Sequence, residues 1–295
     1  MNKFLFFALI FSTIFISCKS AKLSGNKSTG TFDLQGHRGA RGLMPENTIP
    51  AMLKAIDLGV NTLEMDVVFT SDNVAIVSHE PFFNGAITTF PASDEDEKKS
   101  NIYKMTYAET QRYDVGLKGN SSFPEQQKMA VRKPSLSSLI DSVEAYAAKK
   151  NKSIFYNIET KTNPATDGTF HPAPVAFTDM LMKVIRDKGI SDRVTVQSFD
   201  IRTLKHLHSK YPNIKTSLLA DAGNRSSFRK QLDDLGFDPA IYSPEESLVT
   251  ENLIKACYEK NIRIIPWTVN DSKRIRELKK MGVDGIITDY PNRAN

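Results

Sequence analysis

From residue 32 onward, short apolar runs of strand length alternate with longer amphipathic runs of helical length. Apolar residues that recur every three to four positions predict helices, and short bounded apolar runs predict buried strands. The predicted strands of this series are 32–35, 61–68, 154–159, 194–199, 214–219, 240–242, 262–268 and 285–288. The predicted helices are 48–58, 136–149, 175–188, 201–209, 226–235, 251–260 and 272–281.

About eight strands separated by helices over about 260 residues are typical of a (β/α)8 barrel. A doubly wound open sheet is the competing fold, and it usually carries a glycine-rich phosphate loop after its first strand. Here the first predicted strand leads into Gly36-His-Arg-Gly39, which is not that fingerprint. The sequence therefore predicts an α/β protein of the TIM-barrel class.

A further strand-like run at 74–78 follows the second strand too closely for a parallel crossover, which needs a dozen or more residues. We expect it to return antiparallel as a hairpin. A two-residue turn at Ser71-Asp72 would place Glu64 opposite His79.

The stretch from 81 to 133 has weak periodicity and includes the charged run 94–99. Irregular segments of this length in compact domains are usually functional or disordered. We expect an insertion after the hairpin that caps the site, with its charged run at the solvated surface.

The first residues have the features of an export signal and not of the fold. The apolar run 4–16 is shorter than the ~20 residues of a membrane-spanning helix and matches a secretory signal. Residues 16–18 resemble the bacterial lipobox, in which the cysteine is lipidated and becomes the first mature residue. We expect a signal peptide over 1–17, a lipidated Cys18 with a flexible tether over 18–31, and the folded domain over 32–295. An ordinary signal peptide cleaved near Ser17 or Ser20 is the alternative.

Composition and charge change this picture little. The chain is 40% hydrophobic and 25% charged, as soluble globular proteins are. Its net charge is +5, or 5 − 1 = +4 without Lys3 of the signal peptide, and basic residues alternate with acids. A nucleic-acid interface would cluster them with aromatics, so we expect no nucleic-acid partner and a mild preference for anionic substrates. Cys257 has no disulfide partner once Cys18 is lipidated, and its helical surroundings predict a buried structural thiol.

Acidic residues gather at the ends of two neighbouring strands. Glu64 and Asp66 are two apart on one strand and share a face, near the end where barrel active sites lie. Glu159 and Lys161 share a face at the end of the next parallel strand. The alternative is that one acid merely forms a salt bridge with Arg38 or Lys161. Three carboxylates without a histidine–cysteine cluster favour a hard cation, Ca²⁺ or Mg²⁺, over zinc.

Two histidines lie beside this predicted carboxylate cluster. His37 and His79 each follow a strand-like run. A lone histidine is more often a core or surface residue, but a pair beside acids can give and take protons near neutral pH. His206 and His208 lie in a basic helix and are expected to face solvent, and His171 has no assigned role.

A series of motifs runs along nearly the whole mature chain: Gly36-His-Arg-Gly39, Pro45-Glu-Asn-Thr48, Glu64-Met-Asp-Val67, His79, Ile158-Glu-Thr-Lys161, Gln197-Ser-Phe199, Trp267-Thr-Val-Asn270 and Thr288-Asp-Tyr-Pro291. These motifs resemble those of the glycerophosphodiester phosphodiesterase family, in its bacterial, periplasmic-type lipoprotein form. In this order and spacing their combination is highly specific. One departure is Glu80, where the family usually has Asp; its longer side chain can alter how His79 is oriented. A second is that the chain ends soon after the last strand, without a full closing helix.

The resemblance implies a TIM barrel that binds a divalent cation, Ca²⁺ in preference to Mg²⁺. It also implies which residues of this chain form the site. They are Glu64, Asp66 and Glu159 for the metal, His37 and His79 for acid/base catalysis, Arg38, Lys161 and Trp267 for the substrate, and Glu46 in a supporting role.

The implied activity is metal-dependent hydrolysis of glycerophosphodiesters to sn-glycerol 3-phosphate and an alcohol. A lysophospholipase D or phosphoinositide-type phosphodiesterase on a similar barrel is one alternative. A non-catalytic lipoprotein that binds phosphodiesters is another, although binding alone does not need two histidines beside three acids. We expect small-molecule diesters as partners and a lipid anchor at Cys18 that holds the exported protein on a bacterial membrane, facing the periplasm.

Overall fold

The computed structural model describes residues 1, 31–92 and 100–294. The predicted signal peptide, Cys18, the tether up to residue 30 and the charged run 94–99 lie outside the described residues. Within the described residues, no helix combines the length and the apolar character needed to cross a membrane.

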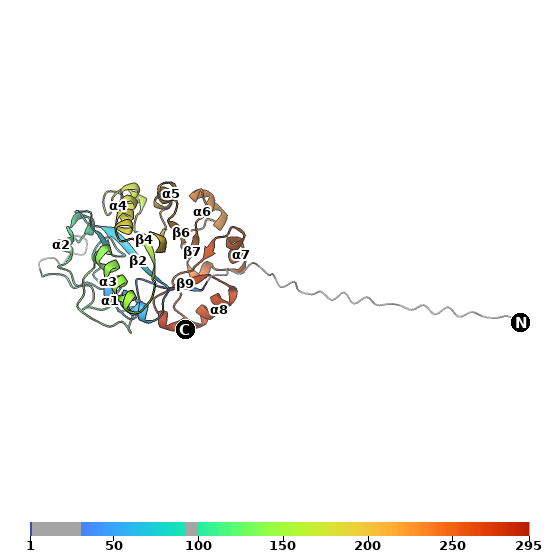
Figure 1. Ribbon diagram of the computed structural model, residues 1–295, viewed down its shortest axis with the longest axis horizontal. Coiled ribbons are helices and arrows are strands. Elements are labelled where there is room, and N and C mark those ends of the chain that lie inside the picture. The colour runs from blue at the N-terminus through green and yellow to red at the C-terminus, as the bar shows by residue number, and fades with distance from the viewer. Residues whose placement is uncertain (2–30, 93–99, 295) are drawn as a thin grey trace.

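Eight parallel strands of the described chain form a barrel, in the order β8-β7-β6-β5-β4-β2-β1-β9 (Figure 1). The amide of Asp284 donates to the carbonyl of Ile264 (3.0 Å) and that of Ile287 to Pro266 (2.9 Å), which closes the barrel between β8 and β9. The predicted TIM barrel is confirmed. Its strands are β1 (Asp33–Gly36), β2 (Thr62–Phe69), β4 (Phe155–Thr160), β5 (Val194–Ser198), β6 (Lys215–Ala220), β7 (Ile241–Pro244), β8 (Arg263–Ile264) and β9 (Gly285–Thr288).

Helices surround this barrel on its outer side (Figure 1). Most begin at a Thr, Ser or Asp whose side chain accepts a backbone N–H of the first turn, as Thr48, Ser135 and Asp271 do. The helices are α1 (Ile49–Asp57), α3 (Leu136–Lys149), α4 (Pro174–Asp187), α5 (Ile201–Lys210), α6 (Phe228–Leu235), α7 (Glu251–Glu259) and α8 (Ser272–Met281). Short helical turns are η2 (Ile102–Lys104), α2 (Tyr107–Thr110), η3 (Pro164–Thr166), η4 (Ser191–Arg193), η5 (Glu246–Leu248) and η6 (Pro291–Arg293). After β9 the described chain forms only η6.

The two faces of each strand differ in chemistry. On β2, Leu63, Met65 and Val67 join the large apolar core with the helices, while Glu64 and Asp66 lie on the opposite face, toward the barrel interior. The interior itself has two halves. Near β7, β8 and β9 it is filled by Ile241, Ile265 and Ile287, whereas the β1–β5 side carries polar side chains. The sheet thus places buried acids beside an apolar wall.

The antiparallel hairpin is confirmed, and its predicted register is wrong by one residue. β3 (Ala75–Val77) pairs with β2 through Val67–Val77 and Phe69–Ala75. The turn has three residues instead of two, and Asn73 adopts the left-handed region with φ +59°. The backbone amide of Ser78 consequently donates to the backbone carbonyl of Asp66 (3.0 Å). His79 lies one residue beyond that contact and does not stand opposite Glu64.

The segment between β3 and α3 builds a small core of its own. Val68 and Ile76 of the hairpin pack with Phe83, Tyr113 and other apolar residues of the insertion, and the rings of Phe83 and Tyr113 stack at 4.1 Å. The insertion therefore packs against the face of the hairpin that carries Val68 and Ile76. Among the described residues it contributes none to the lining of the site pocket, so a capping role stays a prediction.

The last predicted strand but one is shorter than expected. The run 262–268 was expected to be continuous, but β8 ends at Ile264. Pro266 has no amide hydrogen to donate. The chain stays attached to the barrel because the amide of Trp267 donates to the carbonyl of Pro244 (3.0 Å), which holds the indole at the rim of the site.

Candidate active site

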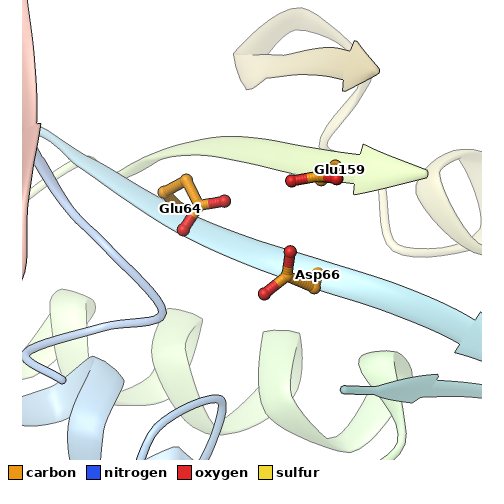
Figure 2. Close-up of side chains that lie close together, drawn as sticks. All are labelled: Glu64, Asp66 and Glu159. Carbon is orange, nitrogen blue, oxygen red and sulfur yellow. The ribbon is translucent and has the colours of Figure 1, made fainter. Parts of the chain in front are cut away.

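Three buried carboxylates meet at the carboxyl ends of β2 and β4. The parallel register pairs Glu64 with Asn157 and Asp66 with Glu159. Figure 2 shows the side chains of Glu64 and Asp66 from β2 and Glu159 from β4 directed into a common space. One oxygen of each lies within 4.8 Å of the others. The three residues predicted from strand alternation are thus brought together.

Hydrogen bonds fix the two acids of β2. The Glu64 Oε2 accepts from the backbone amide of Arg38 (2.8 Å), and its Oε1 accepts from Gln197 Nε2 (2.8 Å). The Asp66 Oδ2 accepts from Asn47 Nδ2 (2.9 Å), and the Asn47 Oδ1 accepts from the Asp66 amide (3.3 Å). Both carboxylates are therefore held in one orientation before any ligand binds.

A row of amide side chains crosses the barrel behind Glu64. Asn157 Nδ2 donates to Gln197 Oε1 (2.9 Å) and to Gln35 Oε1 (2.8 Å). Gln35 Nε2 in turn donates to Asp33 Oδ2 (2.9 Å). We call these three amides the amide ladder. It links β1, β4 and β5 and holds Gln197 so that its NH₂ group faces Glu64.

Lys161 bridges the acids of the two strands. Its Nζ lies 2.7 Å from Glu159 Oε1 and 3.7 Å from Asp66 Oδ1. Burial works to lower the pKa of Lys161, but Glu159 and Asp66 outweigh it and raise the pKa. Lys161 therefore stays charged and is available to an anionic ligand at this edge.

The loop after β1 presents Arg38 to the same cluster. Arg38 has φ +49° and Gly39 φ +88°, and a Cβ on Gly39 would lie 2.6 Å from the backbone of Ala51. This tight turn lets Arg38 Nη1 donate to Glu46 Oε1 (2.6 Å) while Arg41 Nε donates to Glu46 Oε2 (2.6 Å). Burial opposes ionisation of Glu46, yet the two arginines outweigh it and lower its pKa. Glu46 thus remains a carboxylate and fixes both arginines.

His37 is paired with a carboxylate from the other end of the chain. Its Nδ1 lies 2.6 Å from Asp289 Oδ1, and Asp289 Oδ2 accepts from Asn270 Nδ2 (2.7 Å). Burial favours a neutral Asp289, but the charge and hydrogen bond of His37 outweigh it and lower the pKa. An ionised Asp289 accepts the Nδ1–H of His37, which leaves Nε2 for chemistry. Burial lowers the pKa of His37 despite this pairing.

His79 has the same arrangement with its neighbour. The His79 Nδ1 lies 2.8 Å from Glu80 Oε1. Burial opposes ionisation, but the hydrogen bond and charge of His79 bring the pKa of Glu80 down to about 2. Glu80 is therefore an ionised acceptor, and the Nε2 of His79 is left for chemistry in the same way.

These groups surround a pocket of about 260 Å³. One side is polar and the other apolar, with the rings of Phe199 and Trp267 meeting edge to face at 5.6 Å. Trp267 is fixed by its Nε1, which donates to the carbonyl of Ser243 (2.8 Å). The lining residues are His37, Arg38, Arg41, Glu64, His79, Glu159 and Gln197 on the polar side and Phe199, Leu219, Trp267, Thr268 and Ile287 on the other.

Every site residue predicted from the sequence lies in or against this pocket. His37, Arg38, Glu64, His79, Glu159 and Trp267 line it; Asp66, Lys161 and Glu46 contact the lining residues. The ion pairs proposed as the alternative, Arg38–Asp66 and Lys161–Asp66, are also present beside the cluster.

Several residues of the site received no role from the sequence. Asn47, Gln197 and Asp289 stand inside the quoted motifs, which was a signal. Arg41 carried no signal beyond its charge. Outside the site, His171 is buried and accepts from the amide of Asn163 (3.0 Å). Cys257 is buried, and burial raises its pKa to about 12, as an inert structural thiol requires.

The donor set fits a hard divalent cation. Burial, with the charge of Asp66, raises the pKa of Glu64, and burial also raises the pKa of Glu159 against the opposing charge of Lys161. A cation among these oxygens would favour their ionised forms. With every acid ionised and the histidines neutral, the formal charges around the pocket add up to −6 + 4 = −2. The acids are Glu46, Glu64, Asp66, Glu80, Glu159 and Asp289, and the cations are Arg38, Arg41, Lys133 and Lys161. A divalent ion would bring that sum to zero.

Comparison with known proteins adds a family to this geometry. The model of the glycerophosphoryl diester phosphodiesterase family matches residues 37–293. A glycerophosphodiester phosphodiesterase of Bacillus altitudinis is 30% identical over 260 residues, which cover 88% of this chain and 94% of that protein. Another, of Caldanaerobacter subterraneus, is 26% identical over 257 residues, 86% of this chain and 93% of that one.

Solved structures agree on the fold. A crystal structure from Silicibacter pomeroyi superposes with a TM-score of 0.79 and 30% identity, covering 92% of this chain and 95% of that one. A phosphodiesterase of Oleispira antarctica, solved in complex with its product sn-glycerol-3-phosphate, gives a TM-score of 0.71 at 20% identity and covers 89% of this chain and 94% of that one. At that identity the likeness concerns the barrel alone.

Proposed function

Because the chain belongs to the glycerophosphoryl diester phosphodiesterase family, we propose that it hydrolyses glycerophosphodiesters to sn-glycerol 3-phosphate and an alcohol with the help of a divalent cation. The observation that carries this proposal is the pocket in which three clustered carboxylates, two carboxylate-paired histidines and an apolar wall meet. The product bound to the Oleispira phosphodiesterase supports the substrate class.

Glu64, Asp66 and Glu159 would hold the cation, and their hard carboxylate oxygens suit Ca²⁺ or Mg²⁺, with Ca²⁺ preferred. A bound divalent cation would stabilise negative charge on the phosphate in the transition state. Arg38 and Lys161 bring fixed positive charges to the same place. These two residues would position the phosphodiester.

His37 and His79 would move the protons. Each ring presents its Nε2 because Asp289 or Glu80 accepts at Nδ1. One histidine takes the proton of the attacking hydroxyl, from water or the neighbouring glycerol hydroxyl, and the other protonates the departing alcohol. The apolar wall with Trp267 would contact the carbon skeleton of the glycerol.

A direct assay tests the proposal. Purified protein is incubated with glycerophosphocholine, glycerophosphoethanolamine and a lysolipid, and sn-glycerol 3-phosphate and free head group are measured separately. We expect glycerol 3-phosphate from the water-soluble diesters, loss of turnover in excess EDTA, and recovery with Ca²⁺ or Mg²⁺. Full turnover in EDTA would overturn the metal assignment. Choline released only from lysolipid would favour a lysophospholipase D, and binding without any product a non-catalytic lipoprotein.

A further inference from the structure

Lys133 is a buried cation next to the site with no role in the proposed reaction so far. It stands between the insertion and α3, and only 5% of its surface is exposed. Its Nζ donates to Ser78 Oγ (2.8 Å) and lies 5.6 Å from the centre of the Phe83 ring. Among the described residues its ammonium forms no ion pair. Burying an ammonium is unfavourable without compensation, so its place needs a reason.

The hydrogen bonds from Lys133 run toward His79. Ser78 Oγ, which accepts from Lys133, donates to the carbonyl oxygen of Glu80 (2.6 Å). The Glu80 carboxylate in turn is paired with His79 Nδ1 at 2.8 Å. Lys133 is therefore two hydrogen bonds from the backbone of the residue that orients His79.

The charges around Lys133 point to the same place. Burial lowers its pKa, while Glu80 and then Glu46 oppose that effect, and Arg38 and Asp66 act on it more weakly. Conversely Lys133 is among the groups that favour the ionised form of Glu80. Glu80 is therefore the carboxylate that interacts most strongly with this cation.

We propose that Lys133 is a positioning residue of the phosphodiesterase reaction, which through Ser78 holds the segment Ser78-His79-Glu80 so that the Glu80 carboxylate accepts the Nδ1–H of His79. The inference rests on the proposed function. It assigns to Lys133 a role through His79, without contact to substrate.

The competing explanation is that Lys133 only attaches the insertion to the barrel. The structure distinguishes this structural role from the positioning of His79. The backbone attaches this segment by itself, since the carbonyl of Lys133 accepts from Gln111 Nε2 (3.0 Å) and that of Pro134 from the amide of Val77 (3.0 Å). Both contacts remain when the side chain is changed. Substitution of the side chain therefore tests the charge and its hydrogen bond to Ser78.

The test compares Lys133→Met with Lys133→Arg, which keeps the charge. Lys152→Met is the matched control, because Lys152 Nζ donates to the carbonyl of Ile56 (2.8 Å) away from the pocket. For Lys133→Met we expect kcat to fall about tenfold with KM little changed, because the loss is of orientation and not of substrate contact. We also expect the pH profile of kcat to move to higher pH, since a positive charge that disfavours protonation of its neighbours is gone. Lys133→Arg and the control should keep the wild-type profile.

A second readout is independent of turnover. Long-range ¹H–¹⁵N NMR of the imidazole rings, assigned with His79→Asn, reports which nitrogen of His79 carries the proton. We expect Nδ1–H in the wild type and a mixture of tautomers in Lys133→Met. A wild-type protein without phosphodiesterase activity would refute the proposed function, while this measurement would still decide the effect of Lys133 on His79.

The inference fails if folded Lys133→Met keeps the wild-type kcat, pH profile and His79 spectrum and loses only thermal stability. If Lys133→Met does not fold, Lys133→Gln removes the charge while keeping a polar side chain, and the same outcomes apply to it. The double variant with Glu80→Gln adds a third criterion. With Glu80 neutral, removal of the Lys133 charge should have no further effect on the pH profile, and a full additional shift would contradict the proposal.

Discussion

At the scale of single residues, His37 and His79 have the same hydrogen-bond arrangement. Each lies in the pocket with its Nδ1 fixed by an ionised carboxylate, at 2.6 Å in His37 and 2.8 Å in His79. We expect His37→Ala and His79→Ala each to lower kcat by ~10²-fold or more, because each ring is proposed to transfer a proton. Steady-state kinetics measures this. His206→Ala is the control, since His206 also pairs with an aspartate, Asp179 at 2.8 Å, but outside the pocket lining; an equal loss there would contradict the assignment.

The metal carboxylates lead to a prediction about pH. The pKa values of Glu64 and Glu159 are raised in the metal-free fold, chiefly by burial. The folded protein therefore binds more protons than the unfolded chain, and their stabilising contribution, full below the usual carboxylate pKa, is lost as pH rises through the raised values. Cation binding needs both groups ionised. We expect the rise in Tm on adding Ca²⁺ to be larger at about pH 8 than at about pH 5.

Thermal melts with and without Ca²⁺ check this prediction, with Glu64→Gln as a variant that loses one ligand. The rise in Tm should shrink in that variant at every pH. A rise of equal size at both pH values in the wild type would show that protonation of these acids is not linked to cation binding.

The sequence identifies the residues of the site better than the residues that hold them in place. Strand alternation alone pairs Glu64 with Asp66, and the adjacent parallel strand supplies Glu159. The amide ladder could not be found this way, because its contacts join residues 40 and 122 positions apart in the chain. Such contacts depend on the register between β1, β2, β4 and β5, which no local pattern encodes.

At the scale of elements, the turn of the β2–β3 hairpin decides where His79 lies. Asn73 has φ +59°, a conformation that Asn and Gly tolerate and β-branched residues do not. We expect Asn73→Val to lower the free energy of unfolding by about 1–2 kcal/mol, while Asn73→Gly should be close to neutral. Denaturant unfolding measures both. Equal stability of the Val and Gly variants would mean that the left-handed turn is not maintained in solution.

Most elements could be predicted from periodicity, and the two that differ have local causes. The long helices such as α3 and α8 begin and end within a residue or two of expectation, because their apolar spacing and caps are strong signals. The hairpin register was missed since a three-residue turn and a two-residue turn read alike in sequence. The predicted strand 262–268 is longer than β8 because Pro266 lies within an otherwise strand-like run.

At the scale of the whole molecule, the sequence before the barrel suggests how the protein is placed in the cell. We propose that Cys18 is lipidated and tethers the exported domain to a bacterial membrane. Cys18→Ser should release the protein into the soluble fraction and abolish labelling by a clickable fatty acid, with Cys257→Ser as the control that keeps both. Membrane association of Cys18→Ser at the wild-type level would favour an ordinary signal peptide with another means of attachment.

The negative charge around the pocket also bears on the order in which the cation and the substrate bind. With all six carboxylates ionised against four cations, the pocket carries two negative charges. A phosphodiester carries one more, so its entry into the fully ionised pocket without a cation is electrostatically unfavourable. We expect an ordered kinetic scheme in which the cation adds first and the substrate second. In such a scheme diester concentration cannot substitute for the ion, so the supply of the ion becomes a means of controlling flux.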